Sequence, residues 1–142
     1  MDVYHTIQGE GFFSGTPAAF IRIAGCDVGC HWCDTKDSWE ESKYKLIDVK
    51  KIAKKSASFI AAIAVVTGGE PLIYNLNNLT LELIRSGMRT HLETSGAYPL
   101  SGKWHWICLS PKKTKPPVSE IHAKAHELKM IIFNKDDFHW AE

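Results

Sequence analysis

Two apolar runs that each end at glycine constrain most strongly how this 142-residue chain can fold. They read AAFIRIAG at residues 18–25 and FIAAIAVVTGG at residues 59–69. Such runs are typical of buried strands in a parallel sheet. Between them, the segment DVKKIAKKSAS has a helical apolar periodicity behind Asp48, which is suited to be an N-cap. This order predicts an α/β fold with a parallel sheet, because parallel neighbours need crossover connections.

The rest of the chain continues the alternation of strands and helices. The segment NLNNLTLELIRSG sets three leucines on one helical face, and Gly87 is expected to end that helix. Two strands are predicted in RTHLETSG and WHWICLSP, followed by a short helix near residues 118–127 and a strand in LKMIIF. We find no internal repeat or second domain in the sequence, so residues 1–142 are interpreted as one domain.

Composition and charge restrict the partners of the chain. Its net charge of +1 creates no general attraction to nucleic acid or to an anionic membrane. No segment approaches the roughly 20 apolar residues of a membrane span, and the polar start MDVYHTIQGEG lacks the apolar stretch of a secretory signal. We therefore expect a cytoplasmic protein with no nucleic-acid or membrane partner. Four cysteines in that reducing compartment favour a metal or catalytic role over disulfides.

Four loops with chemically suggestive residues each follow a predicted strand. They are the cysteine loop GCDVGCHWCDTKDSW and the segments TGGEP, ETSG and SPKK. Ligands of parallel sheets gather beyond the carboxyl ends of the strands. The four loops are therefore expected to form one site.

The cysteine loop places three thiols, those of Cys26, Cys30 and Cys33, within eight positions. This Cys-x3-Cys-x2-Cys spacing lets one loop bind three irons of a cubane cluster and leave the fourth iron open, which suggests catalysis. The alternative is a zinc ion with His31 or a distant histidine as its fourth ligand. The fourth cysteine, Cys108, lies in an apolar strand and is interpreted as a small buried hydrophobic residue.

Arg22 and the GGE segment are further candidates for binding. Arg22 interrupts an apolar strand, and its guanidinium fork fits a carboxylate; the alternative is an arginine that faces outward from a half-exposed strand. Gly68 and Gly69 allow the backbone to approach a ligand closely, and Glu70 offers an acceptor for an ammonium group. The alternative for this segment is a plain turn between a strand and a helix.

Taken together, the motifs are specific to one family. The three cysteines followed by Gly68-Gly69-Glu70 resemble the radical S-adenosylmethionine (SAM) superfamily. Within it, the chain closely resembles the 7-carboxy-7-deazaguanine synthase family in TIQGEG, FIRIAGC, CDTKDSW, VTGGEP, ETSG, SPK and ELK, which occur in order over most of its length. The resemblance implies a single-domain, incomplete β/α barrel of the radical SAM type.

The resemblance also implies a reaction. Enzymes of this family are carbon-nitrogen lyases that convert 6-carboxy-5,6,7,8-tetrahydropterin to 7-carboxy-7-deazaguanine with loss of ammonia, on the route to queuosine. A reduced 4Fe-4S cluster cleaves SAM, the resulting 5'-deoxyadenosyl radical abstracts a hydrogen from the substrate, and Mg2+ assists the rearrangement. The role of the protein is to bind and orient the cofactors and the substrate and to exclude water. A pterin substrate, a flavodoxin-like or other electron donor and a homodimer are implied as partners.

The resemblance also implies roles for the residues of this chain that match the motifs of the family. Cluster binding is implied for Cys26, Cys30 and Cys33, and magnesium binding for Thr35. SAM binding is implied for Trp32, Cys33, Asp34, Gly69, Glu70, Ser110, Pro111 and Lys112, with Glu93 and Thr94 in the SAM wall. Substrate binding is implied for Ile7, Gln8, Gly9, Glu10, Arg22 and Thr67. Of these residues, Arg22 and Thr35 are the catalytic candidates.

Two departures from the family pattern concern the end of the chain and the ETSG motif. The chain stops at NKDDFHWAE, an opening helix without a cap, whereas members of the family continue with a stretch that contacts SAM and substrate; the C-terminal part of the family fold is expected to be missing. Ser95 stands where the family commonly has asparagine.

Two other functions are alternatives to the radical SAM lyase. They are an activating enzyme of the glycyl-radical type and a non-catalytic zinc or iron-sulfur module.

Overall fold

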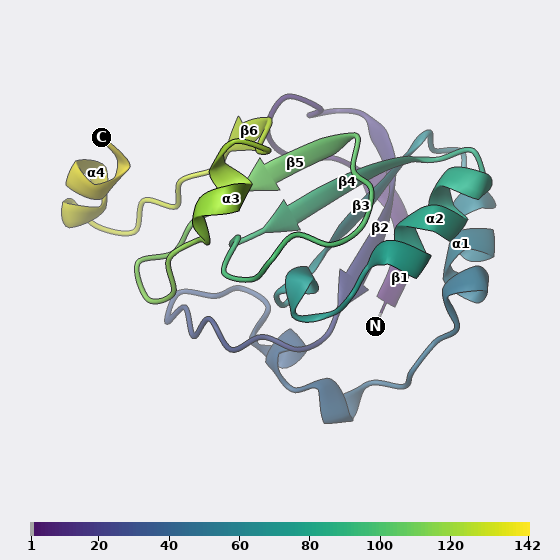
Figure 1. Ribbon diagram of the computed structural model, residues 1–142, viewed down its shortest axis with the longest axis horizontal. Helices are drawn as coiled ribbons and strands as arrows, with labels where there is room; N and C mark the ends of the chain where they lie inside the picture. Colours follow the sequence, from purple (N-terminus) through teal and green to yellow (C-terminus); the bar gives the residue numbers. More distant parts are fainter. Residues whose placement is uncertain (1) are drawn as a thin grey trace.

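A computed structural model describes residues 2–142, which form a six-stranded sheet in the order β1-β2-β3-β4-β5-β6 (Figure 1). β2 to β6 run parallel, and β1 pairs antiparallel with β2. This arrangement confirms the expected α/β class and places the ends of the parallel strands at one edge. The strands are β1 (Asp2–Ile7), β2 (Pro17–Ile23), β3 (Ile63–Gly68), β4 (Arg89–Thr94), β5 (Trp106–Leu109) and β6 (Glu127–Leu128).

Two amphipathic helices cover one face of the sheet (Figure 1). α1 (Val49–Ala57) begins as expected at Asp48, whose carboxylate accepts a hydrogen bond from the Lys50 N–H. α2 (Asn77–Arg85) ends before Gly87, which adopts the left-handed conformation at φ +81°. The shorter helices are α3 (Ser119–His122) and α4 (Asp136–Ala141), with 3-10 turns η1 (Lys36–Trp39), η2 (Glu41–Lys43) and η3 (Pro71–Ile73). No helix within residues 2–142 is long and apolar enough to cross a membrane.

Alternation along the strands divides the buried side chains between the two faces. Ile21 and Val66 point toward the helices and belong to the main core, whereas Ala18 and Val65 pack on the opposite face with Phe13 and Phe20. Phe13, in the loop before β2, therefore covers this second face near the amino ends of the parallel strands. Toward the carboxyl ends of the strands, the same face borders a cavity.

Three sequence predictions of secondary structure are corrected. β1 lies in a stretch interpreted only as polar, because this edge strand is mostly exposed and so lacks an apolar run. The strand expected over LKMIIF pairs with β5 only through Glu127–Leu128, since β5 itself ends at Leu109 and offers no further partner. The helix expected near residues 118–127 is confined to Ser119–His122.

His91 on β4 gives the fold a dependence on pH. Its side chain is 3% exposed, its Nε2 atom has no hydrogen-bond partner within residues 2–142, and its ring meets the Phe13 ring edge-on at 4.5 Å between centroids. Burial, helped by the nearby charge of Arg89, lowers the pKa of His91 to about 4. Between about pH 6.5 and pH 4, His91 is therefore mostly protonated in the unfolded chain and mostly neutral in the native chain.

We expect the stability contributed by neutral His91 to be complete above about pH 6.5 and to decline as the pH falls toward 4. Between pH 7.5 and 5.0 the free energy of unfolding of the wild type should fall about 2 kcal/mol more than that of His91→Leu. Urea unfolding followed by tryptophan fluorescence measures both losses. Because the two proteins differ only at residue 91, equal losses would contradict the role of His91.

Candidate functional site

The four predicted loops meet at a cavity of about 640 Å³ beyond the carboxyl ends of the strands. Every candidate site residue lines this cavity except Pro111, which is buried and does not belong to the lining. The role of Pro111 in binding SAM therefore stays a prediction. The candidates that line the cavity are Ile7, Gln8, Gly9, Glu10, Arg22, Cys26, Cys30, Trp32, Cys33, Asp34, Thr35, Thr67, Gly69, Glu70, Ser110 and Lys112.

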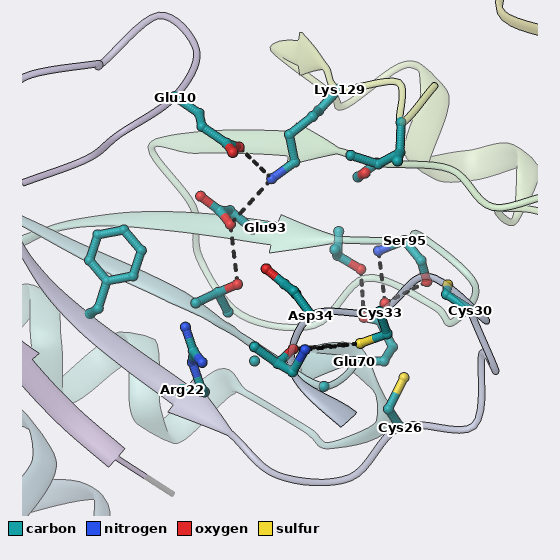
Figure 2. A pocket seen from close by; sticks show the side chains of 18 of the residues that line it. Glu10, Arg22, Cys26, Cys30, Cys33, Asp34, Glu70, Glu93, Ser95 and Lys129 are labelled. Atoms are coloured by element: carbon teal, nitrogen blue, oxygen red, sulfur yellow. Dashed lines mark hydrogen bonds and ion pairs between the residues drawn. The ribbon is translucent and has the colours of Figure 1, made fainter. Parts of the chain in front are cut away.

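The cysteine loop presents three free thiols to the cavity (Figure 2). Partial burial raises the pKa of the Cys26 and Cys30 thiols. The Cys33 sulfur accepts a hydrogen bond from the Thr35 N–H at 3.4 Å and lies 3.6 Å from the Thr35 hydroxyl. His31, the alternative fourth zinc ligand, is exposed outside the cavity lining and packs edge-on against the Phe133 ring. Cys108 is buried in β5, as the sequence predicts.

Gly68 and Gly69 bring the end of β3 against the start of the cysteine loop. A Cβ atom at Gly69 would lie 2.1 Å from the Gly25 carbonyl oxygen, and one at Gly68 would lie 2.2 Å from that of Ile23. The close approach allows the Gly69 N–H to bond the Ile23 oxygen and the Glu70 N–H to bond the Gly25 oxygen, both at 2.8 Å. Glycine is therefore required here by the contact between two backbones.

The Glu70 carboxylate ties the end of β3 to the end of β4. Its side chain is 1% exposed and accepts four hydrogen bonds, from the Leu72 N–H, the Thr94 hydroxyl, and the N–H and hydroxyl of Ser95 (Figure 2). A carboxylate offers about four acceptor positions, so these donors occupy its capacity. Glu70 thereby fixes the floor of the cavity, and its predicted contact with an ammonium group stays a prediction.

Arg22 extends from β2 into the cavity rather than outward to solvent (Figure 2). Its Nη2 atom donates to the Tyr4 hydroxyl at 3.1 Å, and its guanidinium carbon lies 5.9 Å from the centre of the Tyr4 ring. Its Nε atom is buried with no hydrogen-bond partner in the described part of the chain. A buried donor without a partner is unfavourable, so this guanidinium is suited to receive an anionic ligand.

Glu93 and Lys129 form a charged network beside Arg22 (Figure 2). The Glu93 carboxylate accepts hydrogen bonds from Gln8 Nε2 at 2.9 Å and from the Thr67 hydroxyl at 3.2 Å. Lys129 Nζ lies 3.1 Å from a Glu10 oxygen and 3.7 Å from a Glu93 oxygen. Burial acts to lower the pKa of Lys129, but the two carboxylates outweigh it and raise that pKa. No role is predicted for Lys129 from the sequence, although the ELK motif contains it.

Lys112 closes the cavity from the loop after β5. Its ammonium group donates to the carbonyl oxygen and hydroxyl of Ser110 and lies 5.6 Å from the centre of the Trp32 ring. Burial lowers the pKa of Lys112. A desolvated lysine beside an aromatic face provides a local positive charge within a chain that has almost no net charge.

Comparisons with known proteins agree with this geometry. The model of the radical SAM superfamily matches residues 20–108. A 7-carboxy-7-deazaguanine synthase of Flavobacterium psychrophilum is 52% identical over 142 residues, which make up 100% of this chain and 67% of that relative. The crystal structure of QueE from Escherichia coli matches with a TM-score of 0.81 and 31% identity, over 99% of this chain and 72% of that chain. The chain belongs to the radical SAM superfamily, in its 7-carboxy-7-deazaguanine synthase family.

Other relatives extend this family match. A 7-carboxy-7-deazaguanine synthase of Synechocystis is 45% identical over 141 residues, which make up 99% of this chain and 68% of the relative. The chain thus spans about two thirds of the length of these curated relatives. The match also confirms the radical SAM type of α/β fold expected from the motifs.

Membership of the radical SAM superfamily implies a 4Fe-4S cluster and SAM, and the cysteine loop fits such a cluster. All three thiols are free and partly accessible, and they border the same cavity. Within residues 2–142, no three side chains of histidine, cysteine, aspartate or glutamate are grouped closely enough to hold one metal ion. A cluster that takes one thiolate on each of three irons does not require the thiols to converge on one ion.

Proposed function

We propose that this chain is a radical SAM lyase that converts 6-carboxy-5,6,7,8-tetrahydropterin to 7-carboxy-7-deazaguanine with loss of ammonia, in queuosine biosynthesis. One observation carries the proposal: three free thiols and the half-buried guanidinium of Arg22, whose buried Nε atom has no hydrogen-bond partner within residues 2–142, border the same cavity. Thiols supply cluster ligands, and the guanidinium fork suits the carboxylate of the pterin. The curated relatives named 7-carboxy-7-deazaguanine synthase favour this reaction over that of a glycyl-radical activating enzyme.

The cofactor side of the cavity is formed by the cysteine loop and the loops after β3 and β5. The cluster and SAM, when bound, supply the one-electron chemistry that starts the reaction. Cys26, Cys30 and Cys33 would hold the cluster, and the Trp32 ring would lie against the adenine of SAM. The Lys112 ammonium group and the backbone beside Gly69 would hold the polar parts of SAM. Asp34, Glu70 and Ser110 complete this side of the cavity, and the buried Pro111 joins Ser110 to Lys112.

The substrate side is formed by residues of β2, β3 and β4 together with the end of β1 and the loop that follows it. Arg22 would bind the substrate carboxylate, while Gln8, Glu10 and Thr67 would face the polar edges of the pterin ring together with the backbone of Ile7 and Gly9. Glu93 fixes the side chains of Gln8 and Thr67 by direct hydrogen bonds. This pre-arranged polar surface would orient the substrate toward the cofactor side of the same cavity.

Thr35 is proposed to bind Mg2+. Its hydroxyl lies at the border between the cysteine loop and the substrate side, 3.6 Å from the Cys33 sulfur. A hydroxyl oxygen is a suitable hard ligand, and magnesium commonly keeps several waters and accepts oxygens from a substrate.

We further propose that the enzyme acts in the cytoplasm as a homodimer and receives electrons from a flavodoxin-like or similar donor. The four free cysteines support a reducing compartment.

Electron paramagnetic resonance of the anaerobically reconstituted, reduced protein tests the proposal. We expect the signal of a reduced 4Fe-4S cluster that changes when SAM is added, because SAM binds the open iron. Adding the pterin should then yield 7-carboxy-7-deazaguanine and ammonia, measured by mass spectrometry and an ammonia assay. Zinc in place of iron, with no cluster signal, would reject the radical mechanism in favour of a metal-binding module.

A further inference from the structure

The tip of the cysteine loop is held by side chains from elsewhere in the fold. Residues 27–29, between the first two cysteines, take part in no backbone–backbone hydrogen bond with the described part of the chain. The flanks are different: the Cys26 N–H donates to the Trp39 oxygen at 3.2 Å, and the Cys33 N–H donates to the Cys30 oxygen at 3.1 Å. The conformation of the tip therefore depends on side-chain contacts.

Three side chains meet at Asp27 in the tip. Lys115 Nζ lies 2.7 Å from the Asp27 carboxylate and 2.7 Å from the Tyr98 hydroxyl, and the Tyr98 hydroxyl donates to the same carboxylate. The ammonium group also lies 4.1 Å from the centre of the Tyr98 ring. An isolated exposed ion pair contributes little, but here one carboxylate, one hydroxyl and one aromatic face share a single ammonium group.

A fourth contact lies next to this group. The Thr114 hydroxyl donates to the Val28 carbonyl oxygen at 2.9 Å, and the Val28 side chain is buried. Thr114 and Lys115 belong to the segment after β5 that also carries Ser110 and Lys112. The segment at residues 110–115, which is proposed to bind SAM, therefore contacts the tip of the cysteine loop, which is proposed to bind the cluster.

We propose that Asp27, Tyr98, Thr114 and Lys115 form a latch that holds the cysteine loop ready for the cluster and couples it to the segment at residues 110–115. These are positioning residues, since none of the four lines the cavity. The part of the inference that concerns the cluster rests on the proposed function. Opening the latch should loosen the loop and ease the escape of iron without unfolding the sheet, because the latch lies at the surface.

The test compares Lys115→Met and Tyr98→Phe with Lys124→Met, a control at an exposed lysine outside the latch. In the full chain without cluster, exchange of the hydrogen-bonded Cys26 and Cys33 amides, followed in a peptide covering residues 24–35, should be about five-fold faster in the latch variants, as expected for the loss of about 1 kcal/mol. In the reconstituted protein, release of iron to a ferrous chelator should accelerate by a similar factor. Lys115→Arg should restore both rates, and the free energy of unfolding of the latch variants in urea should fall by no more than this loss of about 1 kcal/mol.

The outcomes separate this inference from the proposed function. Failure of the wild type to take up iron would reject the proposed cluster, and hydrogen exchange would still decide whether the latch orders the loop. A stable wild-type cluster, with variants that match it in exchange and in iron release, would reject the latch. A large fall in the urea midpoint of the latch variants would also contradict the inference, because it would show a general loss of stability.

Discussion

Replacing Cys30 with serine should abolish turnover, with a loss of activity on the order of 1,000-fold or more, equivalent to at least about 4 kcal/mol of transition-state stabilisation. The Cys30 thiol borders the cavity and is free to ligate iron. A serine hydroxyl stays protonated at neutral pH and is a poor substitute for a thiolate. Iron content, the cluster signal with and without SAM, and product formation measure the effect.

Cys108 provides the matched control for this substitution. It is the fourth cysteine of the chain, buried in β5, where burial raises the pKa of its thiol to about 11. Cys108→Ser should keep its iron, its SAM-dependent signal and its turnover, with a stability loss of about 1–2 kcal/mol for a buried hydroxyl. A Cys30→Ser protein with a normal cluster and normal turnover would show that Cys30 is not an iron ligand.

The second large effect is expected at Arg22. Arg22→Met should lower kcat/KM for the pterin by about 100- to 1,000-fold, or about 3–4 kcal/mol, because the substrate carboxylate loses its charged partner. Arg22→Lys keeps the charge but loses the planar fork, so an intermediate loss is expected. The cluster signal and its response to SAM should be unchanged in both variants, since Arg22 extends from β2 and is not part of the cysteine loop. Steady-state kinetics with the pterin varied at saturating SAM separate kcat from KM.

The free energy of unfolding should not fall in Arg22→Met, although its activity does. The Arg22 Nε atom is buried without a hydrogen-bond partner among residues 2–142, which costs about 1–3 kcal/mol, so Arg22→Met should fold at least as stably as the wild type. Arg85→Met, at an exposed arginine paired with Glu82 on α2, is the control and should leave kinetics unchanged. Wild-type kcat/KM in Arg22→Met, in a protein that turns over the pterin, would exclude Arg22 as the carboxylate partner.

Much of the fold could be predicted locally. The buried strands β2 and β3 are continuous apolar runs, and α1 begins at a residue whose side chain caps it. The edge strands could not be predicted in the same way. β1 has only one well-buried residue, Val3, and the length of β6 is limited by where its neighbour β5 ends. Edge strands depend on the position of a partner strand more than on their own sequence.

The candidate site divides in the same way. By itself the sequence determined the spacing of Cys26, Cys30 and Cys33, the glycines that permit close backbone contact, and the order of loops after parallel strands, because each follows from neighbouring residues. Only the tertiary structure decided that Glu70 is fully bonded, that Lys129 lies between two carboxylates, and that Lys115 reaches the tip of the cysteine loop. These contacts join residues far apart in the chain, so they exist only once the sheet has set their relative positions.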